Sequence, residues 1–180
     1  MTNDTARADG ELAAIGDRWQ LRFSRALPHP PEKVWRAITE PEHLAAWFPH
    51  RIVGERVAGA PLRFESHDDP SEAFDGEMLR FEPPKLVEFM WGEDVIRIEL
   101  EPDGAHTVLT LLDTFSELGK AARDGAGWHE CLDRLGVDLA GDDLDSCNGT
   151  WAAVNPLYVE KFGPEASTVR PPEGHPVLDD

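Results

Sequence analysis

The stretch LPHPPEKVWRAITEPEHLAAWFPH, residues 27–50, decides how the rest of the chain is interpreted. Proline stands near its start, in its middle and near its end, and the apolar residues between recur at helical spacing. Proline is tolerated in the first turn of a helix and disrupts a helix interior, so Pro31 and Pro41 each begin a short helix. A further proline ends the second helix directly after Trp47 and Phe48. The stretch therefore predicts two short helices back to back, closed by an aromatic pair.

β-Strands are predicted on both sides of these helices. Residues 18–27 alternate between apolar and polar side chains, which is typical of a strand with one face toward water. After the helices, apolar segments are separated by turn-forming runs such as DDP, EPP and PDG. Such short connections make hairpins, and hairpins make an antiparallel sheet. The predicted strands of this second part are 51–57, 61–66, 74–82, 85–92, 94–101 and 105–114.

A long helix is predicted over residues 119–141, where Trp128, Leu132 and Leu135 share one apolar face. The order of elements indicates an α+β fold in which a seven-stranded antiparallel sheet curls around this helix. The two short helices after the first strand close the open end of the sheet. We expect three parts: a disordered N-terminal segment at 1–17, the domain at 18–141, and a C-terminal extension at 142–180 that packs on it.

Composition restricts the partners. The formal net charge of −18 disfavours nucleic acid and anionic membranes, although an acidic surface can also serve solubility alone. Two cysteines are too few for a secreted disulfide scaffold, and the first residues contain no apolar segment. We therefore expect a cytoplasmic protein with no signal peptide and no membrane span. A homodimer is left open.

Four pieces of the sequence, taken in order, resemble the START-like (SRPBCC) superfamily. They are LPHPPEKVWRAITEPEHLAAWF, GEMLRFEPPKLVEFMWG, HTVLTLLDTF and GWHECLDRL. The resemblance covers residues 18 to about 140 and is strongest to the branch of the activator of the heat-shock protein 90 ATPase. It implies a helix-grip fold with a hydrophobic cavity between the sheet and the long helix. The co-chaperone role of the eukaryotic activator, which has a further N-terminal domain, is not expected to transfer.

The leading hypothesis for the site is a cavity wall for a small hydrophobic ligand, because such sites are mainly apolar with few polar anchors. The alternative is a packed core without a cavity. Asp113 stands where members of the family often carry histidine. A carboxylate at this position would suit a cationic or hydroxylated ligand. It faces inward if its strand continues past it, and lies in a solvated turn if the strand ends earlier. The candidate ligand-binding residues are Trp47, Phe48, Phe64, Phe81, Phe89, Trp91, Ile98, Leu109, Leu111, Asp113, Trp128, Leu132 and Leu135.

No catalytic or metal-binding residue is assigned from the sequence, and no cofactor is expected. The seven histidines lack recognised ligand spacing, and there is no Gly-x-Ser-x-Gly elbow or phosphate loop. His129 and Cys131 are two apart on one helix and cannot face each other.

Three functions remain open. The preferred one is a binding protein for a small hydrophobic ligand. The alternatives are an enzyme of the cyclase, dehydratase or hydrolase kind with Asp113 or a histidine as base, and an interaction module of the chaperone-activator kind. Convergent polar groups in the cavity would favour the enzyme, and a large exposed apolar patch would favour the module.

Overall fold

The computed structural model describes residues 7–170. The alternating segment forms strand β2 (Arg18–Leu27), and the two proline-initiated helices follow as α1 (Pro31–Thr39) and α2 (Pro41–Trp47). Each helix has proline in its first turn and no capping side chain. Glu40 between them is extended, the conformation that a following proline imposes, so the two helices remain separate.

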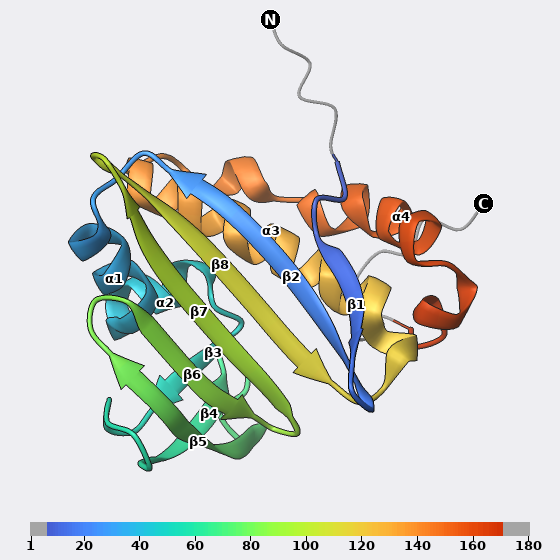
Figure 1. The fold of residues 1–180 in the computed structure, drawn as a ribbon, viewed down its shortest axis with the longest axis horizontal. Coiled ribbons are helices and arrows are strands. Elements are labelled where there is room, and N and C mark those ends of the chain that lie inside the picture. The colour runs from blue at the N-terminus through green and yellow to red at the C-terminus, as the bar shows by residue number, and fades with distance from the viewer. Residues whose placement is uncertain (1–6, 171–180) are drawn as a thin grey trace, which may run out of the picture.

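The strands form one antiparallel sheet in the order β1-β2-β8-β7-β6-β5-β4-β3 (Figure 1). All six strands expected after the helices are present, with ends shifted by a few residues. The remaining strands are β1 (Glu11–Ile15), β3 (His50–Val53), β4 (Pro61–Ser66), β5 (Ala73–Glu82), β6 (Leu86–Trp91), β7 (Asp94–Asp103) and β8 (His106–Phe115).

The sheet has eight strands and not seven, because β1 lies in the segment that was expected to be disordered. Ile15 pairs with Arg18, so only Gly16 and Asp17 connect β1 to β2, and Gly16 has a positive φ of 62°. The two-residue Gly-Asp connection is a hairpin signal, but the segment before it, ELAAI, lacks the alternation typical of a strand. Residues 1–6 of the expected disordered segment and 171–180 of the extension lie outside the described residues.

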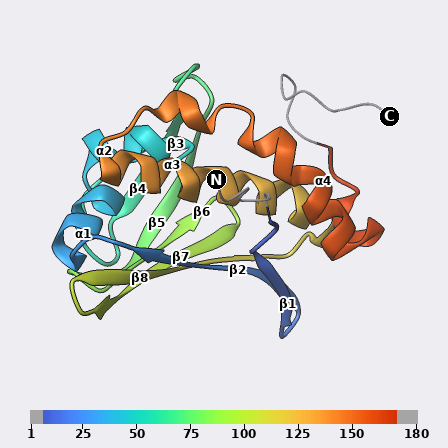
Figure 2. The ribbon, with the colours of Figure 1, turned by 90° about the horizontal axis from the view of Figure 1, so that it is seen from above.

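All helices lie over one face of the sheet (Figure 2). The long helix α3 (Ala121–Ala140) follows a short 3₁₀ turn, η1 (Leu118–Lys120), and ends at Gly141, whose left-handed φ of 73° allows its N–H to return to the Asp138 carbonyl. In the extension, α4 (Thr150–Phe162) lies between two further 3₁₀ turns, η2 (Leu144–Cys147) and η3 (Pro164–Ser167). Helix α4 packs on α3 at Gly125, where an added Cβ would meet Tyr158 at 3.2 Å.

Alternation decides which residues enter the core. Ile96, Ile98 and Leu100 of β7 are buried beneath the helices. Arg97, between them, points to the outer face, where its Nε donates to Glu99 at 2.6 Å. The inner face of the sheet and the apolar sides of α1–α4 thus form one core. Among the described residues, no helix is long and apolar enough to cross a membrane.

Candidate ligand pocket

Phe48, one of the candidate ligand-binding residues, lies inside the molecule. It is 2% exposed, and its ring centroid is 5.5–6.5 Å from those of five aromatic neighbours. Helix α2 ends at Trp47, and the backbone of Phe48 itself is extended. This change of direction turns the Phe48 ring under the sheet. These neighbours are Trp47, Phe64, Phe89, Trp91 and Trp128.

Most of the remaining candidate residues also belong to this packed interior. Ile98, Leu109, Leu111, Leu132 and Leu135 are each at most 3% exposed and lie in the same cluster. Side chains thus fill the part of the interior that they surround, as the packed-core alternative describes.

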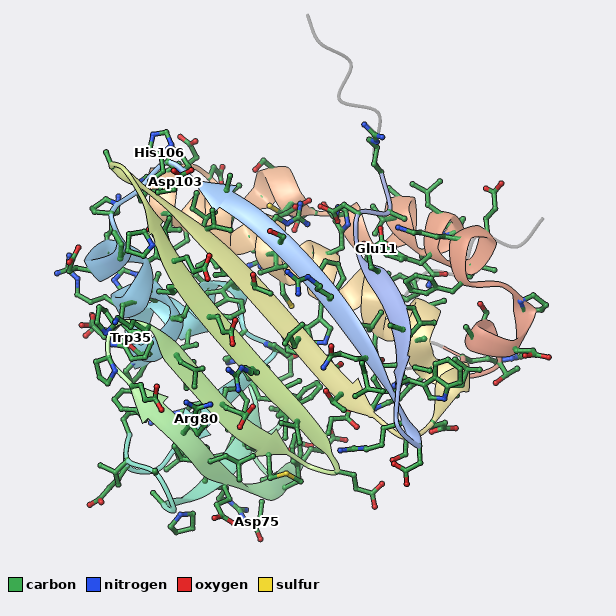
Figure 3. The ribbon with its side chains drawn as sticks, in the orientation of Figure 1. Glu11, Trp35, Asp75, Arg80, Asp103 and His106 are labelled. Carbon is green, nitrogen blue, oxygen red and sulfur yellow. The ribbon has the colours of Figure 1, made fainter. Side chains whose placement is uncertain are left out.

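Phe81 lies apart from the other candidates. Its ring is 5.3 Å from that of Trp35 on α1, and it lines a separate hollow of about 450 Å³ with Thr39 and Arg51. Figure 3 labels Trp35. The position of Phe81 on β5 directs it to the α1 side of the sheet, so it is not part of the site described next.

A pocket of about 360 Å³ opens beyond Phe48, between α3, the start of α4 and the end of β6. The ring centroids of Trp91 and Trp128 are 5.5 Å apart there, and these two are the sequence-predicted residues that the pocket contains. Trp151, in the first turn of α4, supplies a third indole. We call this the tryptophan pocket; it is lined by Pro49, His50, Trp91, Arg123, Asp124, Gly127, Trp128, Glu130, Cys131 and Trp151.

Three features of the fold position this lining. Trp91 is the last residue of β6 and pairs with Asp94 across a tight turn, which holds its indole at the sheet end. The backbone N–H of Trp151 donates to the Glu130 carboxylate at 2.7 Å, and its indole N–H donates to the Arg123 carbonyl at 3.3 Å. Both bonds tie α4 to α3 at the pocket.

A second depression of about 360 Å³ adjoins the tryptophan pocket and shares His50 and Trp91 with it. It is more open and more polar in character, and Glu93, Asp94 and Lys120 line it. The two hollows therefore have the rings of His50 and Trp91 in common, and the centroids of these rings are 5.5 Å apart.

Asp113 is fully buried behind the pocket. Strand β8 continues to Phe115, so the inward alternative for Asp113 holds. Its Oδ2 accepts a hydrogen bond from the indole N–H of Trp128 at 2.8 Å, while its Oδ1 has no partner among the described residues. Burial, and after it the nearby charge of Asp94, raises the pKa of Asp113 to about 7. The hydrogen bond from Trp128 acts in the opposite direction and lowers this pKa, but the two raising effects dominate.

Two more carboxylates approach Asp113. Asp94 and Asp124 each place an oxygen within 4.8 Å of it and of each other, and Lys120 donates to Asp94 and lies 3.4 Å from Asp124. Burial alone would lower the pKa of Lys120, but its carboxylate partners raise it above the usual value. The Lys120 ammonium group already supplies the positive charge that a metal ion would bring to these carboxylates. We therefore interpret the three aspartates as a lysine-bridged acid cluster and assign no metal to it.

Other groups at the pocket are unpartnered or chemically quiet. The Nδ1 of His50 and the Nε1 of Trp91 are buried without a hydrogen-bond partner among the described residues. Burial, with the charge of nearby His67, lowers the pKa of His50 and keeps its ring neutral at physiological pH. Desolvation raises the pKa of the Cys131 thiol, so it is not a ready nucleophile.

A larger pocket of about 660 Å³ lies on another side of α3, around Arg25, His129 and Lys161. Its charged groups bond to one another: His129 Nδ1 lies 3.2 Å from Asp9, and Arg25 lies 2.7 Å from the same carboxylate. These contacts fasten the segment before β1 to α3 and α4, so we assign this pocket a structural role.

Sequence reasoning missed Trp151, His50 and the polar lining on α3. Trp151 belongs to the extension, and its place in the lining of the pocket depends on how α4 packs, which no local pattern encodes. Asp124 and Cys131 could have been found, because they stand four residues before and three residues after Trp128 and so share its side of the helix.

An antiparallel sheet that holds a long C-terminal helix, with a hollow between its open end and that helix, defines a protein of the helix-grip class. Residues 28–139, more than half of the chain, match the family described as Activator of Hsp90 ATPase homolog 1-like protein, and the chain belongs to this family.

Solved structures share this fold. A conserved protein from Enterococcus faecalis has a TM-score of 0.71 at 22% identity, over 85% of this chain and 90% of its own. CalU16 from Micromonospora echinospora has a TM-score of 0.62 at 20% identity, over 91% of this chain and 100% of its own. DynU16, a protein in the dynemicin biosynthetic locus, has a TM-score of 0.61 at 27% identity, over 67% of this chain and 47% of its own. No curated protein matches the sequence.

Proposed function

We propose that the protein binds a small, mainly apolar ligand in the tryptophan pocket. The observation that carries this proposal is the convergence of three indoles, from β6, α3 and α4, on one hollow of about 360 Å³. Aromatic walls with a few polar groups are typical of small-molecule sites, and the volume suits a ligand of one or two rings. The likeness to DynU16, a protein of a biosynthetic locus, agrees with a small-molecule ligand.

Filling the pocket tests the proposal. Gly127 lines it, and a Cβ added at Gly127 would meet no atom within 4 Å, so Gly127→Leu is a suitable substitution to fill the hollow. We expect the wild-type protein to bind the neutral probe 1-naphthalenemethanol, measured by calorimetry, and Gly127→Leu to lose at least tenfold in affinity. Leucine also favours a helix interior over glycine by about 1 kcal/mol, so the variant should be no less stable than the wild type.

Gly136→Leu is the matched control. Gly136 lies on the same helix in equally open space, but it is not part of the pocket lining. It should keep wild-type affinity. If both leucine variants bind the probe equally well, the pocket is not the site.

A second candidate function is a cyclase- or hydrolase-type enzyme with Asp113 as the general base. The pKa of about 7 favours it, because a base is most effective when its pKa is near the working pH. A base must also reach the proton that it removes, and Asp113 is not among the lining residues of the tryptophan pocket, whereas Trp128, its hydrogen-bond donor, is. We therefore rank binding above catalysis.

An interaction module of the chaperone-activator kind is ranked last. The described residues expose only four large hydrophobic side chains, Ile15, Val53, Val57 and Val159, and these come from separate elements or loops. Such scattered residues do not make the large apolar patch that this function would need. We further propose the cytoplasm as the location, because Cys131 and Cys147 are free thiols.

A further inference from the structure

We propose that the tryptophan pocket selects a cationic ligand, an amine attached to an aromatic body. This inference rests on the proposed function and specifies the ligand's chemical class. It follows from the charges and hydrogen-bond acceptors at the pocket, which the apolar walls alone would not require.

Carboxylates outnumber cations around the two adjoining hollows. Asp124 and Glu130 line the tryptophan pocket, while Glu93 and Asp94 line the depression beside it. The cations among the same lining residues are Arg123 and Lys120.

Both of these cations are already paired. Arg123 Nε donates to Asp124 at 2.8 Å, and Lys120 donates to Asp94. The buried Asp113 carboxyl adds further negative charge behind them whenever it is ionised. Four carboxylates thus face two cations at the two hollows, and this balance disfavours an anionic ligand and favours a positive one.

The acceptors suit an ammonium group in particular. Glu130 already accepts the Trp151 backbone N–H, yet an ionised carboxylate has further lone pairs available. An ammonium group carries three N–H donors and no acceptor, so it can bond to Glu130 on α3 without leaving an acceptor of its own unpaired.

The aromatic walls contribute to the same preference. An indole face attracts a cation within about 6 Å of its centre, and tryptophan is the strongest of the aromatic side chains in this respect. The net charge of −18 also draws cations toward the protein over long range. Walls, acceptors and overall field therefore favour the same ligand class.

Three probes of one shape separate this inference from the proposed function. They are 1-naphthylmethylamine, which is protonated at pH 7, neutral 1-naphthalenemethanol, and anionic 1-naphthoate. Calorimetry at low salt should give the amine an affinity at least tenfold above that of the alcohol, with the acid weakest. If no probe binds, the proposed function fails, and this inference with it. If the alcohol or the acid binds as tightly as the amine, the binding function stands and the cation preference is overturned.

Charge-removing variants locate the preference. Asp124→Asn and Glu130→Gln should each lower the affinity for the amine by about tenfold, equivalent to one charge-assisted contact of roughly 1.4 kcal/mol. The affinity for the alcohol should stay unchanged. Asp103→Asn at the β7–β8 hairpin (Figure 3) removes the same charge roughly 30 Å along β7 from Asp94 and should have no effect on either probe. Equal weakening of both probes by Asp124→Asn and Glu130→Gln would mean that these residues only support the pocket, and would overturn the inference.

Discussion

Asp113 carries a carboxyl group whose surroundings favour its protonated form. Its pKa rises from 3.8 in an ordinary environment to about 7 in the fold, chiefly through burial. Between these two values the native state therefore binds more protons than the unfolded chain. The contribution of Asp113 to the free energy of unfolding is fully present below about pH 4. It falls as the pH rises toward 7 and changes little above that.

Asp113→Asn should remove this pH dependence. Asparagine mimics the neutral acid, and its oxygen can still accept the Trp128 indole N–H. We expect the variant to be more stable than the wild type at pH 8 by roughly 2–4 kcal/mol, and the two to be similar near pH 4. Urea unfolding across this range provides the measurement. Burial also raises the pKa of Asp94, which gives the same slope in both proteins, so the difference between the curves reports Asp113. Parallel curves would refute the assignment.

At the scale of elements, periodicity and proline placement were sufficient for α1, α2, α3 and seven of the strands. These elements follow from local rules: alternation in strands, a first-turn proline in the short helices, and a repeating apolar face in the long one. The tertiary site follows from them only in part. Trp91 and Trp128 could be predicted as neighbours from the inner faces of β6 and α3.

The size of the interior could not be predicted. Whether a hollow remains between sheet and helix depends on where one side chain, Phe48, comes to lie, and that is set by packing among five other rings. In the same way, the third wall of the pocket depends on α4, whose docking on α3 requires the close approach at Gly125. Contacts between residues far apart in the chain leave no periodic signal.

Two side chains of helix α4 hold the start of strand β1: Lys161, which donates to the Gly10 carbonyl and to Glu11 at 2.9 Å, and the hydroxyl group of Tyr158. Tyr158 accepts the backbone N–H of Gly10 at 3.1 Å and lies 2.9 Å from His129 Nδ1. Tyr158→Phe should lower the free energy of unfolding by about 1–3 kcal/mol, because it leaves the Gly10 N–H buried without its acceptor. Hydrogen exchange should also accelerate at the amides of β1. Val159→Ala, an exposed position on the same helix, serves as the control. Unchanged protection of β1 in Tyr158→Phe would show that other contacts hold the strand.

For the whole molecule, the net charge of −18 sets how stability responds to salt. Acidic groups exceed basic ones by about two to one, so most long-range charge interactions in the folded state are repulsive. Opposing this, ion pairs such as Arg80–Glu82, at 2.7 Å, are attractive and are also weakened by salt, but exposed pairs of this kind are worth little. Repulsion therefore dominates the balance.

Added salt should accordingly stabilise the protein. The screening length falls from about 30 Å at 0.01 M to about 8 Å at 0.15 M ionic strength, which removes repulsion across the molecule and leaves contacts at 3–4 Å largely intact. We expect the midpoint of thermal unfolding to rise over this range of sodium chloride at pH 7. Affinity for 1-naphthylmethylamine should fall over the same range, because the field that attracts the cation is screened as well. A midpoint that stays constant or falls with salt would mean that local ion pairs, and not the overall charge, govern the electrostatics of the fold.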